Sequence, residues 1–176
     1  MRRLAILCLP LIALVAPATA LALGDGSSSN DGTLVVKSAS APRTVPVVTL
    51  VINGTALGHV STGSPDQTDT VVIDDPNNTN DIGASITSGG NPLTRKTVST
   101  TETKFVGSDF RFRAAGGTYK IWIYGSGVDV FAVGKGTVIV QGQSDSSTDG
   151  WYAIDGGARH SLPAVPSSLL TFPLGG

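Results

Sequence analysis

The sequence predicts an all-β domain, an antiparallel β-sandwich with meander or Greek-key hairpins. The 176 residues include 22 glycines, and among the 13 acidic residues only Glu102 is a glutamate. Aspartates in Asp-Gly, Asp-Asp and Asp-Pro pairs favour turns, and no window outside the first 22 residues keeps a helical period. The main alternative is a short β-solenoid, which the similarity of GTLVV at 32–36 to GTVIV at 136–140 suggests.

Residues 1–22 have the three parts of a secretory signal peptide: a basic start, an apolar run over 4–15 and small residues up to Ala20 or Ala22. The apolar run is too short to span a membrane. The only cysteine, Cys8, lies inside it. We therefore expect a secreted, extracellular protein whose mature chain has no disulfide, no thiolate metal site and no membrane span.

Removal of this leader changes the charge balance. Of the 12 basic residues, Arg2 and Arg3 are lost, which leaves 10 against 13 acidic residues and a net charge of −3. Such a chain is a poor partner for nucleic acid. We divide the remainder into a flexible polar spacer at 23–31, a single β domain at 32–165 and a C-terminal tail at 166–176.

The stretch 116–142 predicts the centre of the fold, because glycines separate three runs of β-branched and aromatic residues. Gly125-Ser126 and Gly134-Lys135 each place glycine first in a two-residue turn, as a type II′ hairpin requires. A further turn is expected at Gly116-Gly117. These turns predict a meander in which Ile123 opposes Val128. Val138 and Val140 then fall on the opposite face from Ile121 and Ile123.

Other strands are expected on both sides of this meander. Asn53-Gly54 is a strong hairpin signal, and residues 75–91 read as a polar loop. A last hairpin is expected about Asp155-Gly156-Gly157, between strands at 151–154 and 158–162. The remaining predicted strands are 32–37, 47–52, 55–60, 69–74, 98–104 and 105–113.

Three segments carry a resemblance to a known group: FVGSDFRFRAAGG at 105–117, SGVDVFAVGKGTVIVQG at 126–142 and DGWYAIDGGARHSLP at 149–163. They resemble uncharacterised secreted all-β proteins of high-GC Gram-positive bacteria, over roughly the second half of the mature chain. The chain departs from that group at Phe131, where a small polar residue is more usual. The resemblance implies location and fold, and it implies no catalytic residue.

His59 and His160 are the only histidines, and neither lies in a catalytic spacing. A hydrolytic triad is recognised by geometry and can assemble from distant residues. A secreted hydrolase with an unrecognised site therefore stays open, against the alternative of two surface histidines.

The segment DDPNNTND has oxygen-bearing side chains at alternating positions, like the first ligands of a calcium loop. Asn80 replaces the turn glycine, however, and Ile86 stands where the closing acid would be. We expect an Asx-rich turn here, and neither a metal nor a cofactor. The alternating residues are Asp75, Asn77, Thr79 and Asp81.

One constellation is a candidate binding site. A turn at Gly116-Gly117 would bring two arginines beside a lysine and two aromatic rings on one face of the sheet. Such a stripe can stack on sugar rings or hold anionic polymers. Alternatively, the aromatic rings are core and the arginines reach water. The residues are Arg111, Arg113, Lys120, Trp122 and Tyr124.

These observations favour a secreted, non-catalytic structural or binding protein, with cell-envelope polysaccharide or another extracellular protein as the candidate partner. A hydrolase or a protein-binding inhibitor module is the alternative.

Overall fold

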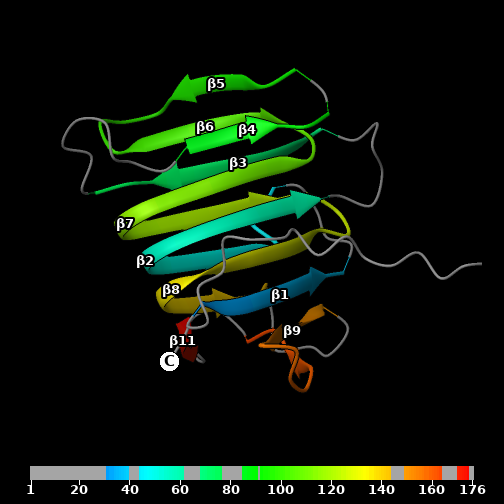
Figure 1. The fold of residues 1–176 in the computed structure, drawn as a ribbon. Helices are drawn as coiled ribbons and strands as arrows, with labels where there is room; N and C mark the ends of the chain where they lie inside the picture. The colour runs from blue at the N-terminus through cyan, green and yellow to red at the C-terminus, as the bar shows by residue number, and fades with distance from the viewer. Residues whose placement is uncertain are drawn as a thin grey trace, which may run out of the picture.

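The computed structural model describes residues 31–39, 44–61, 68–76, 85–90, 92–143, 149–163 and 170–174. Within these ranges the chain forms eleven β-strands and no helix, and every strand pair is antiparallel (Figure 1). The predicted all-β antiparallel fold is confirmed. The strands are β1 (Gly32–Ser38), β2 (Val48–Ser61), β3 (Asp69–Asp74), β4 (Ser85–Ser88), β5 (Thr94–Thr97), β6 (Glu102–Gly107), β7 (Phe110–Tyr124), β8 (Asp129–Gln141), β9 (Gly150–Ile154), β10 (His160–Ser161) and β11 (Leu170–Leu174).

All described strands belong to one sheet, ordered β10-β9-β1-β8-β2-β7-β3-β6-β5, with β4 paired to β7 and β11 to β8. Three strands, β2, β7 and β8, are 13 to 15 residues long and curve at the same side of the molecule (Figure 1). We call the part with β1, β4, β9, β10 and residues 55–61, 110–115 and 129–134 the front half. The rear half contains β3, β5, β6, β11 and residues 48–53, 118–124 and 136–141.

Glycines mark the line along which the three long strands bend. Gly54 pairs with Gly136, and the register shift beside Gly54 places an extra residue in β7 at Gly116-Gly117. Gly54, Gly116, Gly117 and Gly136 have φ values of 141°, 96°, 99° and 121°, which L-residues with side chains rarely adopt. A Cβ at Gly54 or Gly136 would also overlap the backbone of the neighbouring strand. We call this row the glycine fold line.

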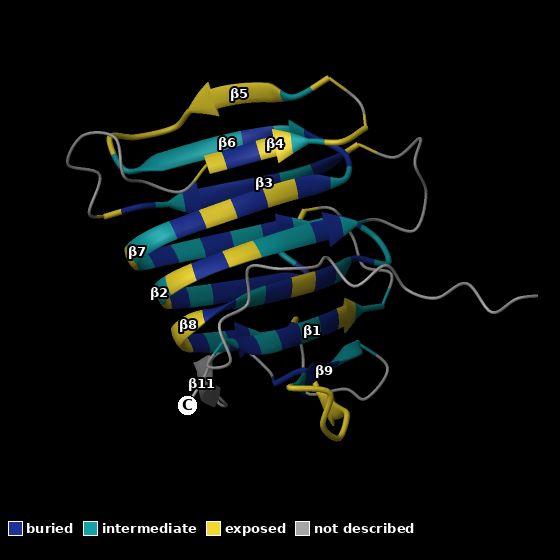
Figure 2. Ribbon diagram, in the orientation of Figure 1, coloured by how far each residue is buried: buried dark blue, intermediate teal, exposed yellow. Residues whose placement is uncertain are grey.

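The core lies between the two halves, because residues on the inner side of each are buried and form one cluster (Figure 2). Phe110 and Phe112 contribute from the front half, and Ile121 and Ile123 from the rear half. Tyr119 is 1% exposed and its hydroxyl donates to the carbonyl of Gly116 on the fold line. Burial, followed by the negative charge of Asp75, raises the pKa of Tyr119.

The expected hairpins at Asn53-Gly54, Gly116-Gly117 and Gly134-Lys135 are wrong. Each of these three residue pairs lies inside one continuous strand that passes from one half of the sheet to the other. Glycine permits a bend with positive φ as readily as a tight turn, so the residue type alone did not separate the two.

The predicted meander is also wrong. Residues 125–128 connect β7 to β8, but β2 lies between these two strands, so Ile123 pairs with Val48 and not with Val128. Because β8 does not turn at Gly134, its alternation continues. Val138 and Val140 therefore face the core together with Val130. The predicted meander had placed them on the opposite face.

The remaining fold predictions have mixed outcomes. The hairpin about Asp155-Gly156 is confirmed as β9–β10, and 69–74 coincides with β3. The second, separate sheet of a sandwich is not confirmed, since the described strands form one folded sheet. The parallel rungs of a solenoid are absent from the described strand pairs. Within the expected tail at 166–176, β11 joins the sheet.

The expected signal peptide at 1–22 and Cys8 lie outside the described residues, as does all of the spacer except Asp31. In the part of the chain that the structure describes, no helix is long and apolar enough to cross a membrane.

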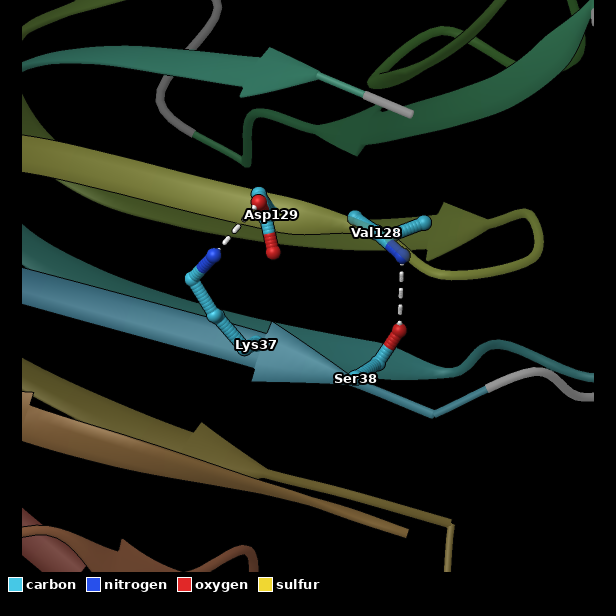
Figure 3. A network of polar contacts seen from close by, with 4 residues as sticks. All are labelled: Lys37, Ser38, Val128 and Asp129. Atoms are coloured by element: carbon cyan, nitrogen blue, oxygen red, sulfur yellow. Dashed lines mark hydrogen bonds and ion pairs between the residues drawn. The ribbon is translucent and has the colours of Figure 1, made fainter. Parts of the chain in front are cut away.

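Polar contacts fasten the start of β8 to the end of β1 on the front half (Figure 3). The backbone N–H of Val128 donates to the Ser38 hydroxyl at 3.0 Å. The Lys37 ammonium forms an ion pair with Asp129, with Nζ 2.9 Å from Oδ2 and both side chains nearly half exposed. The connection at 125–128 is thus held against β1.

Candidate functional site

The five residues of the predicted stripe do not share one face. Because β7 is continuous through Gly116-Gly117, Arg111 and Arg113 point outward from the front half. Lys120, Trp122 and Tyr124 point outward from the rear half. The fold line therefore divides the candidate site into two parts.

On the rear half, Trp122 lies at the centre of the outer face. Its strand neighbours are Thr49 of β2 and Val72 of β3. The side chain is neither fully buried nor fully exposed. The Lys120 ammonium lies 4.7 Å from the centre of the indole ring, a cation–π contact that keeps the ring oriented. Trp122 is therefore partly exposed on the outer face and is not part of the core cluster.

Beside Trp122 is an open pocket of about 270 Å³. Three hydroxyl groups, one ammonium and one apolar side chain line it. Thr70 and Tyr124 oppose each other on β3 and β7, and Val72 opposes Lys104 of β6. Because successive side chains of a strand point to opposite faces, all four of these residues lie on the outer face. The lining residues are Thr44, Thr70, Val72, Lys104 and Tyr124.

This pocket suits a small polar unit. Small-molecule sites usually have volumes of roughly 300–1,000 Å³, so this one is sized for a single sugar residue or a similar group. Hydroxyls both donate and accept hydrogen bonds, as sugar hydroxyls do. We call the pocket together with Lys120 and Trp122 the Trp122 face.

The front half has a more apolar outer face. Leu57 is 62% exposed and Phe131 is 41% exposed, both large values for such side chains. Phe131 pairs with His59, which in turn pairs with Arg111. Arg113 opposes Leu57. We call these five residues the Phe131 face.

A histidine–aspartate contact lies at the rim of the Phe131 face. His59 Nε2 and Asp109 Oδ1 are hydrogen-bonded, and both side chains are about 40% exposed. Among the described residues, Asp109 is the only hydrogen-bonding partner of the His59 side chain. A histidine oriented by an acid supplies two parts of a triad, and no hydroxyl contacts it in these ranges. Neither residue lines the pocket.

The other histidine has no acid partner in the described ranges. His160 stacks on Tyr152, with ring centres 5.3 Å apart. Burial raises the pKa of Tyr152. This contact fixes the β9–β10 hairpin at the edge of the sheet.

The calcium-like segment is only partly visible. Asp75 is described and is 6% exposed, whereas Asn77, Thr79 and Asp81 lie outside the described residues. Within the described ranges, no three histidine, cysteine or acidic side chains gather as metal ligands.

The sequence did indicate Tyr124 but missed the other residues of the pocket. Alternation in DTVVID and ETKFV was enough to place Thr70, Val72 and Lys104 outward on their strands. What the sequence lacked was the order of the strands, because β3 and β6 become neighbours of Tyr124 only in the folded sheet.

Comparison with known proteins finds no relative of this chain. No family model, curated protein or solved structure matches this chain. The class that the fold and the surface define is thus a single folded antiparallel sheet with a small polar pocket on one outer face.

Proposed function

We propose that this chain is an exported, non-catalytic binding module that holds cell-envelope polysaccharide on its Trp122 face. The observation that carries the proposal is the pocket of three hydroxyls and one ammonium beside a partly exposed, oriented indole ring. Aromatic rings stack on the apolar faces of sugars, while hydroxyls and amines bind sugar oxygens. The signal peptide predicted at residues 1–22 supports export to the place where such polymers occur.

Replacing Trp122 with alanine should abolish retention on purified cell-envelope polysaccharide. The same change should lower the free energy of unfolding by about 2–5 kcal/mol, because most of a Trp side chain's roughly 150–250 Å² is packed against its neighbours here. A pull-down with the insoluble polymer measures retention, and a chemical unfolding curve measures stability.

Trp151 provides a matched control for this experiment. It is also half-buried and has a cation, Arg159, 4.1 Å from its ring centre, but it lies on β9 of the front half. Trp151→Ala should leave retention intact. If both variants, or neither, lose retention while remaining folded, the Trp122 face is not the binding surface.

A second candidate function is protein binding, and the exposure of Leu57 and Phe131 favours it. Neighbouring apolar side chains beside Arg111 and Arg113 suit a partner segment with apolar and acidic residues.

Phe131→Ser separates the two functions. We expect it to leave polysaccharide retention unchanged and to alter stability by less than about 1 kcal/mol, since the ring is on the surface. The same polymer pull-down checks this. Loss of retention in Phe131→Ser, together with intact retention in Trp122→Ala, would move the binding function to the Phe131 face.

A further inference from the structure

Lys104 is the only charged residue that lines the pocket. It lies on β6, an interior strand of the rear half between β3 and β5. The described residues give its ammonium no ion pair and no hydrogen bond. A cation aimed into a pocket of hydroxyls, with no carboxylate to neutralise it, favours an anion in that space.

A second lysine strengthens the local positive charge. Lys96 of β5 is directly opposite Lys104 in the register, and like charges in opposite positions destabilise a sheet. Lysine on an edge strand such as β5 is explained as protection against unwanted strand pairing. That explanation does not extend to Lys104, because β6 is paired on both sides.

Acidic residues do occur on the same outer face, but away from the pocket. Asp74 and Glu102 oppose each other, one outward position beyond Val72 and Lys104. The pocket extends in the other direction along the strands, toward Thr70 and Tyr124. No carboxylate therefore lines it.

We infer that the pocket takes an anionic group of the bound polysaccharide, either the carboxylate of a uronic acid or the phosphate of a phosphodiester-linked polymer. This inference rests on the proposed function. The Lys104 ammonium donates charge-assisted hydrogen bonds to the anion, and the hydroxyls of Thr44, Thr70 and Tyr124 donate to its remaining oxygens. The indole of Trp122 packs against the sugar ring that carries the anion.

The test compares three soluble polymers for binding to the mature chain: polygalacturonate, poly(glycerol phosphate) and neutral dextran. Binding of at least one anionic polymer should exceed that of dextran, and added salt should weaken it. The two anionic arms distinguish carboxylate from phosphate. Lys104→Gln should reduce the anionic affinity about tenfold or more, as loss of a charged hydrogen bond does.

Matched variants separate this role from a change in net charge or in folding. Lys37→Gln also removes one positive charge, but from the Lys37–Asp129 pair on the front half (Figure 3), and should change affinity less than about twofold. Lys104→Arg keeps the charge and should retain most of the affinity. Thermal unfolding of each variant shows whether it is folded.

Each outcome has a distinct meaning. Equal binding of dextran and the anionic polymers, unchanged in Lys104→Gln, would overturn the inference and leave the proposed function intact. Failure of the folded wild-type chain to bind any of these polymers or purified cell-envelope polysaccharide would overturn both.

Discussion

Replacing Phe112 with alanine is expected to lower the free energy of unfolding by about 3–5 kcal/mol, as truncation of a buried phenylalanine does. Phe112 is 2% exposed and lies where the two halves of the sheet meet. Its ring occupies the space above Gly58 of β2, where any Cβ would overlap the ring atoms. The variant therefore leaves a cavity above Gly58, which has no side chain to fill it. Urea unfolding followed by tryptophan fluorescence measures the loss.

Phe131 supplies the control, because it is also a phenylalanine on a long strand of the front half but is 41% exposed. Phe131→Ala should lower the free energy of unfolding by less than about 1 kcal/mol. Equal losses in the two variants would mean that the core does not lie between the two halves of the folded sheet.

Gly136→Ala is expected to destabilise the protein by about 3 kcal/mol or more. An alanine at φ = 121° is strained by about 1–3 kcal/mol, and its Cβ would also overlap the carbonyl oxygen of Asn53 on β2. The ladder between β2 and β8 continues on both sides of Gly136. Neither strand can therefore move away from the added Cβ without breaking several hydrogen bonds. Chemical unfolding of the variant and the wild type gives the difference.

Gly116→Ala is the matched variant on the same fold line. Gly116 has φ = 96°, but no atom lies within 4 Å of the position its Cβ would take. Gly116→Ala should therefore show only the effect of backbone strain, and it should lower the free energy of unfolding less than Gly136→Ala does. If a hairpin turned at Gly134-Lys135, residue 136 would begin an ordinary strand and alanine there would be neutral or stabilising. That result would contradict the continuous β8.

The glycines show how far local sequence could predict this fold. Asn53-Gly54, Gly116-Gly117 and Gly134-Lys135 all have the composition of tight turns, and all three lie within continuous strands. A tight turn and a bend in a long strand both use glycine, either for positive φ, as at Gly54 and Gly116, or for close backbone approach, as at Gly134. The choice between them depends on what pairs with the chain on either side, and Gly54 pairs with Gly136, 82 positions away.

The candidate site was divided for the same reason. Lys120, Trp122 and Tyr124 were placed together on one face by alternation, which depends only on the strand itself. Arg111 was expected opposite Trp122 only because a turn was assumed at Gly116-Gly117. In the structure Arg111 pairs with His59 and Trp122 with Thr49, on different halves of the sheet.

The sequence by itself determined the all-β class, the location of most strands and, for most of them, the side that faces inward. The exception is the second half of β8, where the turn assumed at Gly134-Lys135 put Val138 and Val140 on the wrong face. These properties follow from residue type and a period of two, which are local. The tertiary structure alone decided that β2 lies between β7 and β8, that the sheet folds along a row of glycines, and that Lys104 and Thr70 meet Tyr124 at one pocket. The strand order that forms is the one that buries all apolar faces of the chain at the same time. No short window contains that information, because the pairing partners are separated by tens of residues.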